Sequence, residues 1–164
     1  MFIFAPPAQA VVPLAGAKNE YFPVNRVYCV GRNYAEHDKE MGGTGNTTPC
    51  FFMKPADAIF PIDAGVTAQV PFPQRTENLQ HEVELVVAVG RGGKNLTADE
   101  AQECIWGWAV GVDLTRRDLQ AAAKAKGFPW TTAKSFDFSG PVSHLVPKGR
   151  VLDPKDSELW LYVN

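Results

Sequence analysis

The chain has 164 residues, of which 45% are hydrophobic, and this is enough for one domain with a sizeable core. A formal net charge of −2 provides no basic surface for nucleic acid or an anionic membrane, so we expect neither as a partner. No apolar run approaches the roughly 20 residues that span a bilayer, and the N-terminus lacks the features of a signal peptide. The three cysteines lack CxxC spacing, which indicates reduced thiols and favours a cytoplasmic protein.

The N-terminal part differs in character from the rest of the chain. Residues 1–24 carry four of the 13 prolines without a clear periodicity, so we interpret them as an extended lead-in with one short strand at 10–14. Residues 25–164 are predicted to form the main domain. There, prolines and glycines separate short apolar runs, a pattern typical of a β-rich chain with substantial loops.

The remaining elements follow from periodicity and from stop signals. Apolar runs predict strands at 26–31, 49–55, 57–61, 66–70, 81–89, 105–113, 144–147 and 158–163. Helices are predicted at 32–41, at 98–104 after a capping box, and at 116–126 before a glycine. Residues 91–94 read as a hairpin-type turn. This mixture predicts an α+β, β-dominated fold.

Two carboxylates stand side by side on the strand predicted at 81–89. Residues i and i+2 of a strand point to the same face, so Glu82 and Glu84 are neighbours. Two such charges about 4 Å apart repel by roughly 4 kcal/mol at an effective dielectric constant near 20. Solvation at a sheet edge, a shared proton or a divalent cation would each relieve this repulsion. Oxygen ligands favour Mg²⁺, Mn²⁺ or Ca²⁺ over Zn²⁺.

Two further pairs have helical spacing. His37 and Glu40 are three residues apart, so on a helix the carboxylate would orient the imidazole as in a general base that acts on water. A surface pair of no function has the same spacing, and the pattern alone leaves both readings open. Arg117 and Gln120 likewise share one face of the helix predicted at 116–126.

Five runs of the sequence together resemble the fumarylacetoacetate hydrolase family. They are GRNYAEHDKE (31–40), FMKPADA (52–58), HEVELVVAVG (81–90), GVDLTRRDLQ (111–120) and AKSFD (133–137). They occur in the family's order, and the resemblance extends from about residue 24 to the C-terminus. Within the family, residues 22–43 and 51–58 look most like the fumarylpyruvate hydrolases of gentisate breakdown.

The resemblance implies a catalytic site, which we carry over residue by residue. It implies a divalent metal, Mg²⁺ with Mn²⁺ or Ca²⁺ as alternatives, and its ligands would be Glu82, Glu84 and Asp113. The groups assigned to water activation are His37 and Glu40. The groups that hold or polarise the substrate are Arg117, Gln120 and Lys134. The sequence leaves open whether Lys54 and Arg32 line the pocket or form structural ion pairs.

The implied reaction is hydrolysis of a carbon–carbon bond in a β-diketo acid, for example fumarylpyruvate to fumarate and pyruvate. The alternatives are a decarboxylase or isomerase acting on oxaloacetate-like or hydroxymuconate-like acids, or a non-catalytic truncated chain that needs a partner. The implied fold is a mixed β-sandwich or roll with short helices outside, usually as a homodimer. The family's later strands and its Gly/Thr/Pro-rich loop are not found after residue 164, so we expect the catalytic domain at 25–164 to be C-terminally incomplete.

Overall fold

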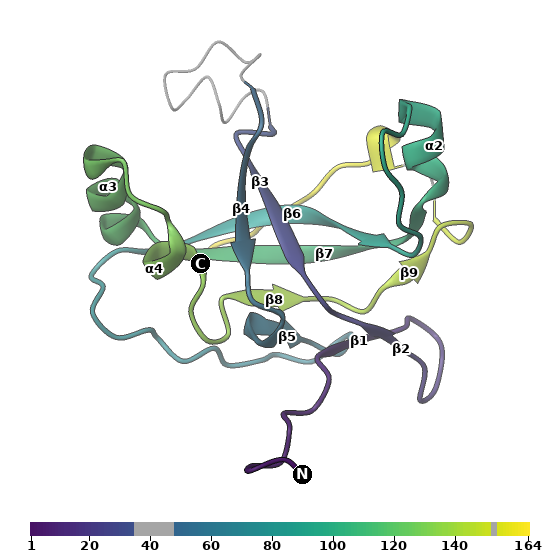
Figure 1. Ribbon diagram of the computed structural model, residues 1–164, viewed down its shortest axis with the longest axis horizontal. Helices are drawn as coiled ribbons and strands as arrows, with labels where there is room; N and C mark the ends of the chain where they lie inside the picture. The colour runs from purple at the N-terminus through teal and green to yellow at the C-terminus, as the bar shows by residue number, and fades with distance from the viewer. Residues whose placement is uncertain (35–47, 152–153) are drawn as a thin grey trace.

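The computed structural model describes residues 1–34, 48–151 and 154–164. At its centre are two long antiparallel strands, β6 (Leu79–Val89) and β7 (Ile105–Arg116), which run across the middle of Figure 1. They belong to a mixed sheet in the order β5-β8-β7-β6, with β9 (Val146–Pro147) also paired to β7. Strand β5 (Ile59–Pro61) is parallel to β8 (Gly140–Val142), which is antiparallel to β7.

Two smaller antiparallel pairs accompany this sheet. Strand β1 (Val11–Pro13) pairs with β2 (Tyr21–Pro23), and β3 (Val27–Gly31) pairs with β4 (Cys50–Lys54). In Figure 1 the β3–β4 pair crosses in front of the long strands, while β1 and β2 lie below them. Strand β4 thus reaches the sheet near the end where β7 runs into a helix.

The helices are short and lie at the two ends of the long strands (Figure 1). At one end is α2 (Ala98–Glu103), and at the other are α3 (Arg117–Lys126) and α4 (Thr131–Lys134). Two single 3-10 turns, η1 (Ala56–Ala58) and η2 (Pro154–Asp156), complete the described elements. The capping box at the start of α2 is present, and α3 ends at a left-handed glycine with φ 67°. The predicted α+β, β-dominated fold is therefore confirmed.

The core lies where the lead-in meets the central sheet. Its buried members are Val12, Val24, Ala88, Ala109, Val142 and Leu145. Because two of these residues come from 1–24, that part of the chain contributes directly to the core. The division of the chain at residue 24 stays a prediction.

The register of β6 and β7 explains where the carboxylates lie. Directly opposed residues share a face, and here Glu82 opposes Asp113, while Val86 opposes Ala109 of the core. The carboxylates and the core alanine therefore belong to the same face of the sheet. On the opposite face, β6 carries the exposed apolar residues Val87 and Val89.

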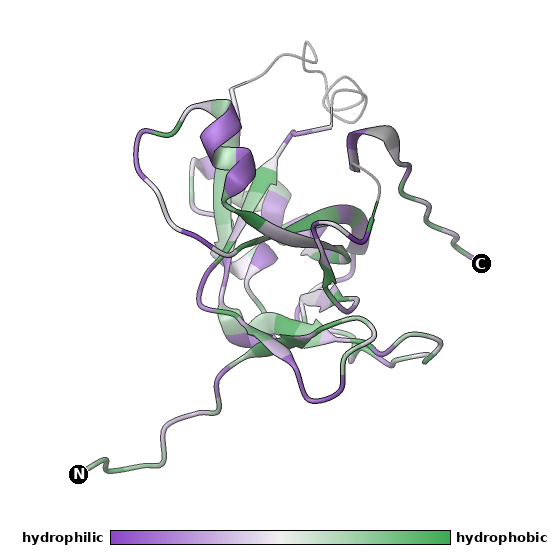
Figure 2. Ribbon diagram, turned by 90° about the vertical axis from the view of Figure 1, so that its right-hand side faces the viewer, coloured by the Kyte–Doolittle hydropathy of each residue, from purple (hydrophilic) through white to green (hydrophobic). Residues whose placement is uncertain are grey.

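Several predicted elements differ from the observed ones. Residues 66–70 and 158–163 form no strand, since alternation without a hydrogen-bonded neighbour does not fix a strand. After η2 the chain instead continues to the C-terminus as an extended trace without secondary structure (Figure 2). No hairpin occurs at 91–94, because this segment leads into α2. Strand β8 and helix α4 were not predicted. Of the helix expected at 32–41, residues 32–34 are not helical, and 35–41 lie outside the described residues.

Gly107 allows β9 to approach β7 closely. A Cβ atom at this position would overlap the backbone of Val146 and lie 3.2 Å from the Pro147 Cα. We predict that Gly107→Ala lowers the free energy of unfolding by about 1–3 kcal/mol, because the two backbones must separate. Urea denaturation measures this difference. The matched control is Gly149→Ala, where a Cβ atom meets nothing within 4 Å. Equal stabilities of the two variants would contradict the prediction.

Candidate active site

Three acidic side chains converge on the core-side face of β6 and β7. Glu82, Glu84 and Asp113 each offer a carboxylate oxygen, and these oxygens lie within 4.8 Å of one another. The Asp113 side chain is buried, while both glutamates are half-buried. The predicted ligand set is thus brought together by strand register, with Asp113 inside β7 rather than at its carboxyl end.

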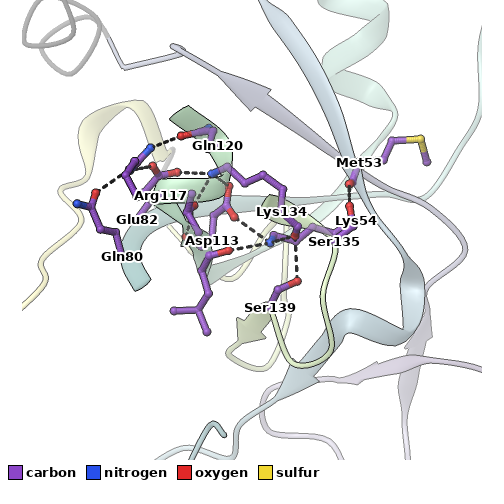
Figure 3. A network of polar contacts seen from close by, with 12 residues as sticks. Met53, Lys54, Gln80, Glu82, Asp113, Arg117, Gln120, Lys134, Ser135 and Ser139 are labelled. Atoms are coloured by element: carbon purple, nitrogen blue, oxygen red, sulfur yellow. Dashed lines mark hydrogen bonds and ion pairs between the residues drawn. The ribbon is translucent and has the colours of Figure 1, made fainter. Parts of the chain in front are cut away.

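Lys134 provides the central positive charge of this cluster. Its side chain is 2% exposed and comes from the end of α4. The Nζ atom donates hydrogen bonds to Glu82 Oε2 at 2.7 Å, Asp113 Oδ2 at 2.6 Å and Thr115 Oγ1 at 2.6 Å (Figure 3). An ammonium group has three donors, so these bonds use all of its hydrogen-bonding capacity.

Lys54 is a second buried cation behind the first. It is 2% exposed, and its Nζ lies 2.9 Å from Asp113 Oδ1 and donates at 2.5 Å to the backbone oxygen of Lys134. Burial lowers the pKa of Lys54, while the charge of Asp113 opposes that shift. Of the two readings left open for this lysine, the structure supports the structural ion pair. Arg32, by contrast, lines the cleft described below.

Arg117 connects α3 to β6. Its guanidinium donates to Gln80 Oε1 at 2.7 Å, to Gln120 Oε1 at 2.6 Å and to Glu82 Oε1, as Figure 3 shows. Gln120 is itself buried. The predicted pair on one face of α3 is therefore assembled beside the carboxylates. In this arrangement, Arg117 binds both Gln120 and Glu82.

The electrostatic environments of the two glutamates differ. Burial alone would raise the pKa of Glu82, but the charges and hydrogen bonds of Lys134 and Arg117 outweigh burial and lower it. Glu84 accepts no hydrogen bond from the described residues, and burial followed by the charges of Asp113 and Glu82 raises its pKa to about 7. Ion pairing with Lys134 and Arg117 therefore offsets the charge repulsion at Glu82. At Glu84 the raised pKa favours the neutral, protonated carboxyl group, which reduces the same repulsion.

The three carboxylates fit a hard divalent cation. Such ions bind oxygen at about 2.0–2.6 Å, so two ligand atoms of one ion lie at most about 5 Å apart, as the three oxygens here do. Asp113 Oδ1 is buried and pairs with the Lys54 ammonium at 2.9 Å. Glu84, by contrast, accepts no hydrogen bond from the described residues, and a bound cation would satisfy it.

A cleft of about 270 Å³ opens over this cluster. Its walls include Glu82, Glu84, Lys134 and Arg117, together with the aromatic rings of Phe52 and Trp130. These rings are 5.7 Å apart between centroids. Lys124, which was not predicted as a site residue, also lines the cleft. Its position seven residues after Arg117 on a predicted helix was the available signal. His37 and Glu40 lie outside the described residues.

Residues 26–164 match the family model described as fumarylacetoacetate (FAA) hydrolase C-terminal. The chain belongs to the fumarylacetoacetate hydrolase family. A structural relative is the fumarylpyruvate hydrolase of Pseudomonas aeruginosa, solved in complex with Mn²⁺ and pyruvate, with a TM-score of 0.88 and 46% identity. That match covers 92% of this chain and 64% of the relative. The predicted similarity to fumarylpyruvate hydrolases is thus confirmed.

Sequence relatives carry a different name. The protein called "oxaloacetate tautomerase FAHD1, mitochondrial" is 42% identical over 139 residues in Arabidopsis thaliana and 46% identical over 138 in Rattus norvegicus. These matches cover 85% and 84% of this chain but only 60% and 61% of the relatives. None of the described helices has the length and apolar character needed to cross a lipid bilayer. The cytoplasmic location and the homodimer stay predictions.

The raised pKa of Glu84 predicts a pH-dependent stability of the metal-free protein. The pKa of a glutamate carboxyl group is ordinarily 4.5, and in this fold burial raises that of Glu84 to about 7. The contribution of Glu84 to stability is therefore complete below pH 4.5 and is lost as the pH rises through 7. We expect Glu84→Gln to raise the free energy of unfolding at pH 8 by about 1–3 kcal/mol, with little effect at about pH 5. Urea denaturation in the presence of a chelator measures this difference.

The control for this prediction is Glu158→Gln, an exposed glutamate far from the carboxylate cluster in sequence. It should change the stability by the same small amount at both pH values. A gain from Glu84→Gln that is as large in the acidic buffer as in the alkaline one would contradict the electrostatic explanation.

Proposed function

We propose that this protein is a metal-dependent hydrolase that cleaves a carbon–carbon bond of a β-diketo acid. An acylpyruvate such as fumarylpyruvate is the proposed substrate, with fumarate and pyruvate as products. The observation that carries the proposal is the arrangement of three carboxylates and the buried ammonium of Lys134 at one side of a cleft. The similarity to a fumarylpyruvate hydrolase that was solved with Mn²⁺ and pyruvate supports it.

In the proposed site, Glu82, Glu84 and Asp113 hold the cation, for which we propose Mg²⁺, with Mn²⁺ or Ca²⁺ as alternatives. When bound, it supplies Lewis acidity toward the two carbonyl oxygens of the 1,3-dicarbonyl group. The cleavage adds the oxygen of water to the acyl carbon and leaves the electron pair of the broken bond on pyruvate as an enolate. A proton then converts this enolate to the methyl group of pyruvate.

Lys134 is proposed to stabilise the negative charge of the enolate. Its ammonium is held in a fixed position by Thr115 and Asp113, so little reorganisation is needed when that charge develops. Arg117 and Gln120 are proposed to hold the substrate at the wall formed by α3. The removal of a proton from water is assigned to His37 and Glu40 on the sequence alone.

A second candidate function is oxaloacetate tautomerisation, and it rests on the 42–46% identity to proteins of that name. Moving a proton between carbon and oxygen of an α-keto diacid also passes through an enolate, so the same charged groups would serve. Substrate profiling separates the two functions. Release of pyruvate from fumarylpyruvate indicates the hydrolase, whereas faster decay of enol-oxaloacetate absorbance without pyruvate release from fumarylpyruvate indicates the tautomerase.

Removal of one carboxylate should abolish metal-dependent activity. We predict that Glu82→Gln lowers the rate of pyruvate release with Mg²⁺ by a factor of about 100 or more, because the ligand set loses a charge and Lys134 loses a partner. The control is Glu103→Gln, whose carboxylate is 74% exposed and lies 3.7 Å from Lys148 Nζ. This variant should retain full activity. If Glu82→Gln releases pyruvate as fast as the unmodified protein, the enzymatic role of the cluster is wrong.

Lys134→Met should separate metal binding from catalysis. The ammonium occupies one oxygen each of Glu82 and Asp113, so its loss leaves these oxygens available to a cation. We expect Mg²⁺ affinity, measured by calorimetry, to be retained or to increase, while kcat falls about 100- to 1000-fold. A parallel loss of metal affinity and kcat would assign Lys134 a structural role. Circular dichroism of the variant verifies that it is folded.

A further inference from the structure

The guanidinium of Arg117 is held by three different side chains. Its Nε atom donates at 2.7 Å to Gln80 Oε1, one terminal nitrogen donates at 2.6 Å to Gln120 Oε1, and the other donates to Glu82 Oε1 (Figure 3). A guanidinium has five N–H donors, so these three bonds with described residues leave two donors. Because Arg117 lines the cleft, the two donors can serve a ligand there.

Gln80 is the partner of Arg117 to which the proposed function assigns no role. Its side chain is exposed, and it is not among the residues that line the cleft. It lies on β6 two residues before Glu82, so both side chains point to the same face of the strand. Gln80 therefore reaches Arg117 from beside the carboxylate cluster without facing the substrate.

The amide group of Gln80 is itself oriented by a neighbour. Its Nε2 atom donates at 3.3 Å to Asn78 Oδ1, which leaves Oε1 as the acceptor for Arg117. The backbone oxygen of Asn78 also accepts from the backbone N–H of Arg117 at 2.7 Å. Asn78 thus binds both the backbone of Arg117 and the residue that holds the Arg117 side chain.

The first residues of α3 are fixed to the same segment of the chain. Asp118 Oδ1 accepts from Thr76 Oγ1 at 2.6 Å, and Asp118 Oδ2 accepts from the backbone N–H of Glu77 at 3.1 Å. Thr76 Oγ1 in turn accepts from the backbone N–H of Asn78 at 3.2 Å. Residues 76–80 therefore hold the start of α3 against the beginning of β6, and the backbone of Arg117 has a fixed position relative to Gln80.

The bond to Gln80 restrains the guanidinium at a different place from the other two bonds. The terminal nitrogens are the ends of the fork, whereas Nε is its stem, so the bond at Nε fixes the direction in which the fork points. A hydrogen bond from a charged donor is about twice as strong as a neutral one. An exposed contact of this kind adds little to the stability of the fold. Its effect is therefore expected on the orientation of Arg117.

We propose that Gln80 is a positioning residue that acts through Arg117. By accepting the Nε–H, it fixes the plane of the guanidinium and directs the two remaining donors to the substrate. This inference rests on the proposed function, which assigns substrate binding to Arg117. It adds a residue that touches neither the substrate nor the metal ligands' cation.

Proton exchange at Arg117 Nε tests the bond directly and requires no activity. The Nε–H signal of Arg117 is identified in ¹H–¹⁵N spectra by its absence from Arg117→Met. We expect Gln80→Met, which keeps the side-chain length but lacks the amide oxygen, to accelerate this exchange about tenfold or more. Gln80→Glu retains an oxygen acceptor and should preserve the slow exchange. The matched control is Gln102→Met, at an exposed position of α2, which should leave the exchange unchanged.

Kinetics test the consequence for the substrate. With fumarylpyruvate and Mg²⁺, Gln80→Met should raise KM about fivefold with little change in kcat, whereas Gln80→Glu should keep KM within about twofold. When Arg117→Met is already present, adding Gln80→Met should leave KM unchanged, because the group that Gln80 holds is absent. Urea denaturation should show nearly equal stabilities for Gln80→Met and the unmodified protein.

Two outcomes would overturn the inference. In one, Gln80→Met leaves the exchange at Arg117 Nε as slow as before. In the other, Gln80→Met raises KM by the same factor with and without Arg117→Met, which means that Gln80 acts elsewhere. If the unmodified protein instead releases no pyruvate from fumarylpyruvate, the hydrolase proposal is wrong, and the exchange rate still decides whether Gln80 holds Arg117. Failure of the proposed function and failure of the inference are thus distinguishable.

Discussion

Three carboxylates on one partly buried sheet face must be matched by positive charge, and much of the structure around them meets this requirement. Isolated charges are expensive to bury, and acidic neighbours increase that cost. Here Lys134, Lys54 and Arg117 place three cations beside these carboxylates and form ion pairs with Glu82 and Asp113. Each cation comes from a different element, respectively α4, β4 and α3. The placement of these elements around β6 and β7 is therefore coupled to the electrostatics of the cluster.

The distribution of charge within the cluster is uneven, and this has a chemical consequence. Glu82 forms ion pairs with Arg117 and Lys134, whereas Glu84 accepts no hydrogen bond from the described residues. Because Glu84 is the carboxylate with the least compensation, a divalent cation would stabilise it the most. Lys134 would then be less needed as a counter-charge, and its ammonium would be available for a substrate oxygen. The same residue thus stabilises the metal-free fold and is suited to stabilise an enolate.

The sheet explains how core and site share one face. On β7 the buried residues run from Gly107 through Ala109 and Gly111 to Asp113 and Thr115. The face is apolar where it packs against the lead-in and polar where it meets α4. Gly111 lies opposite Glu84, and a Cβ atom there would meet the Val86 side chain at 2.7 Å. A small residue is therefore needed where the face changes from core to site.

Much of the site could be predicted from sequence, because its residues have local spacings with physical meaning. The two glutamates at i and i+2 of a strand, and Arg117 with Gln120 at i and i+3 of a helix, lie on common faces as expected. The role of Lys54 could not be settled this way. Lys54 contacts Asp113 although the two are far apart in sequence, and no local pattern encodes such a contact. The strand expected at 158–163 failed for a related reason, since strand pairing depends on a distant partner.

The sequence by itself determined the class of fold, the family and the residue types of the site, since these depend on composition, short-range periodicity and ordered motifs. The tertiary structure decided which charges neutralise one another. It placed Asp113 opposite Glu82 through strand register and inserted Lys134 between them from a helix of a single turn. Register and helix docking are long-range properties, and they turn a set of charged residues into a site with a defined geometry.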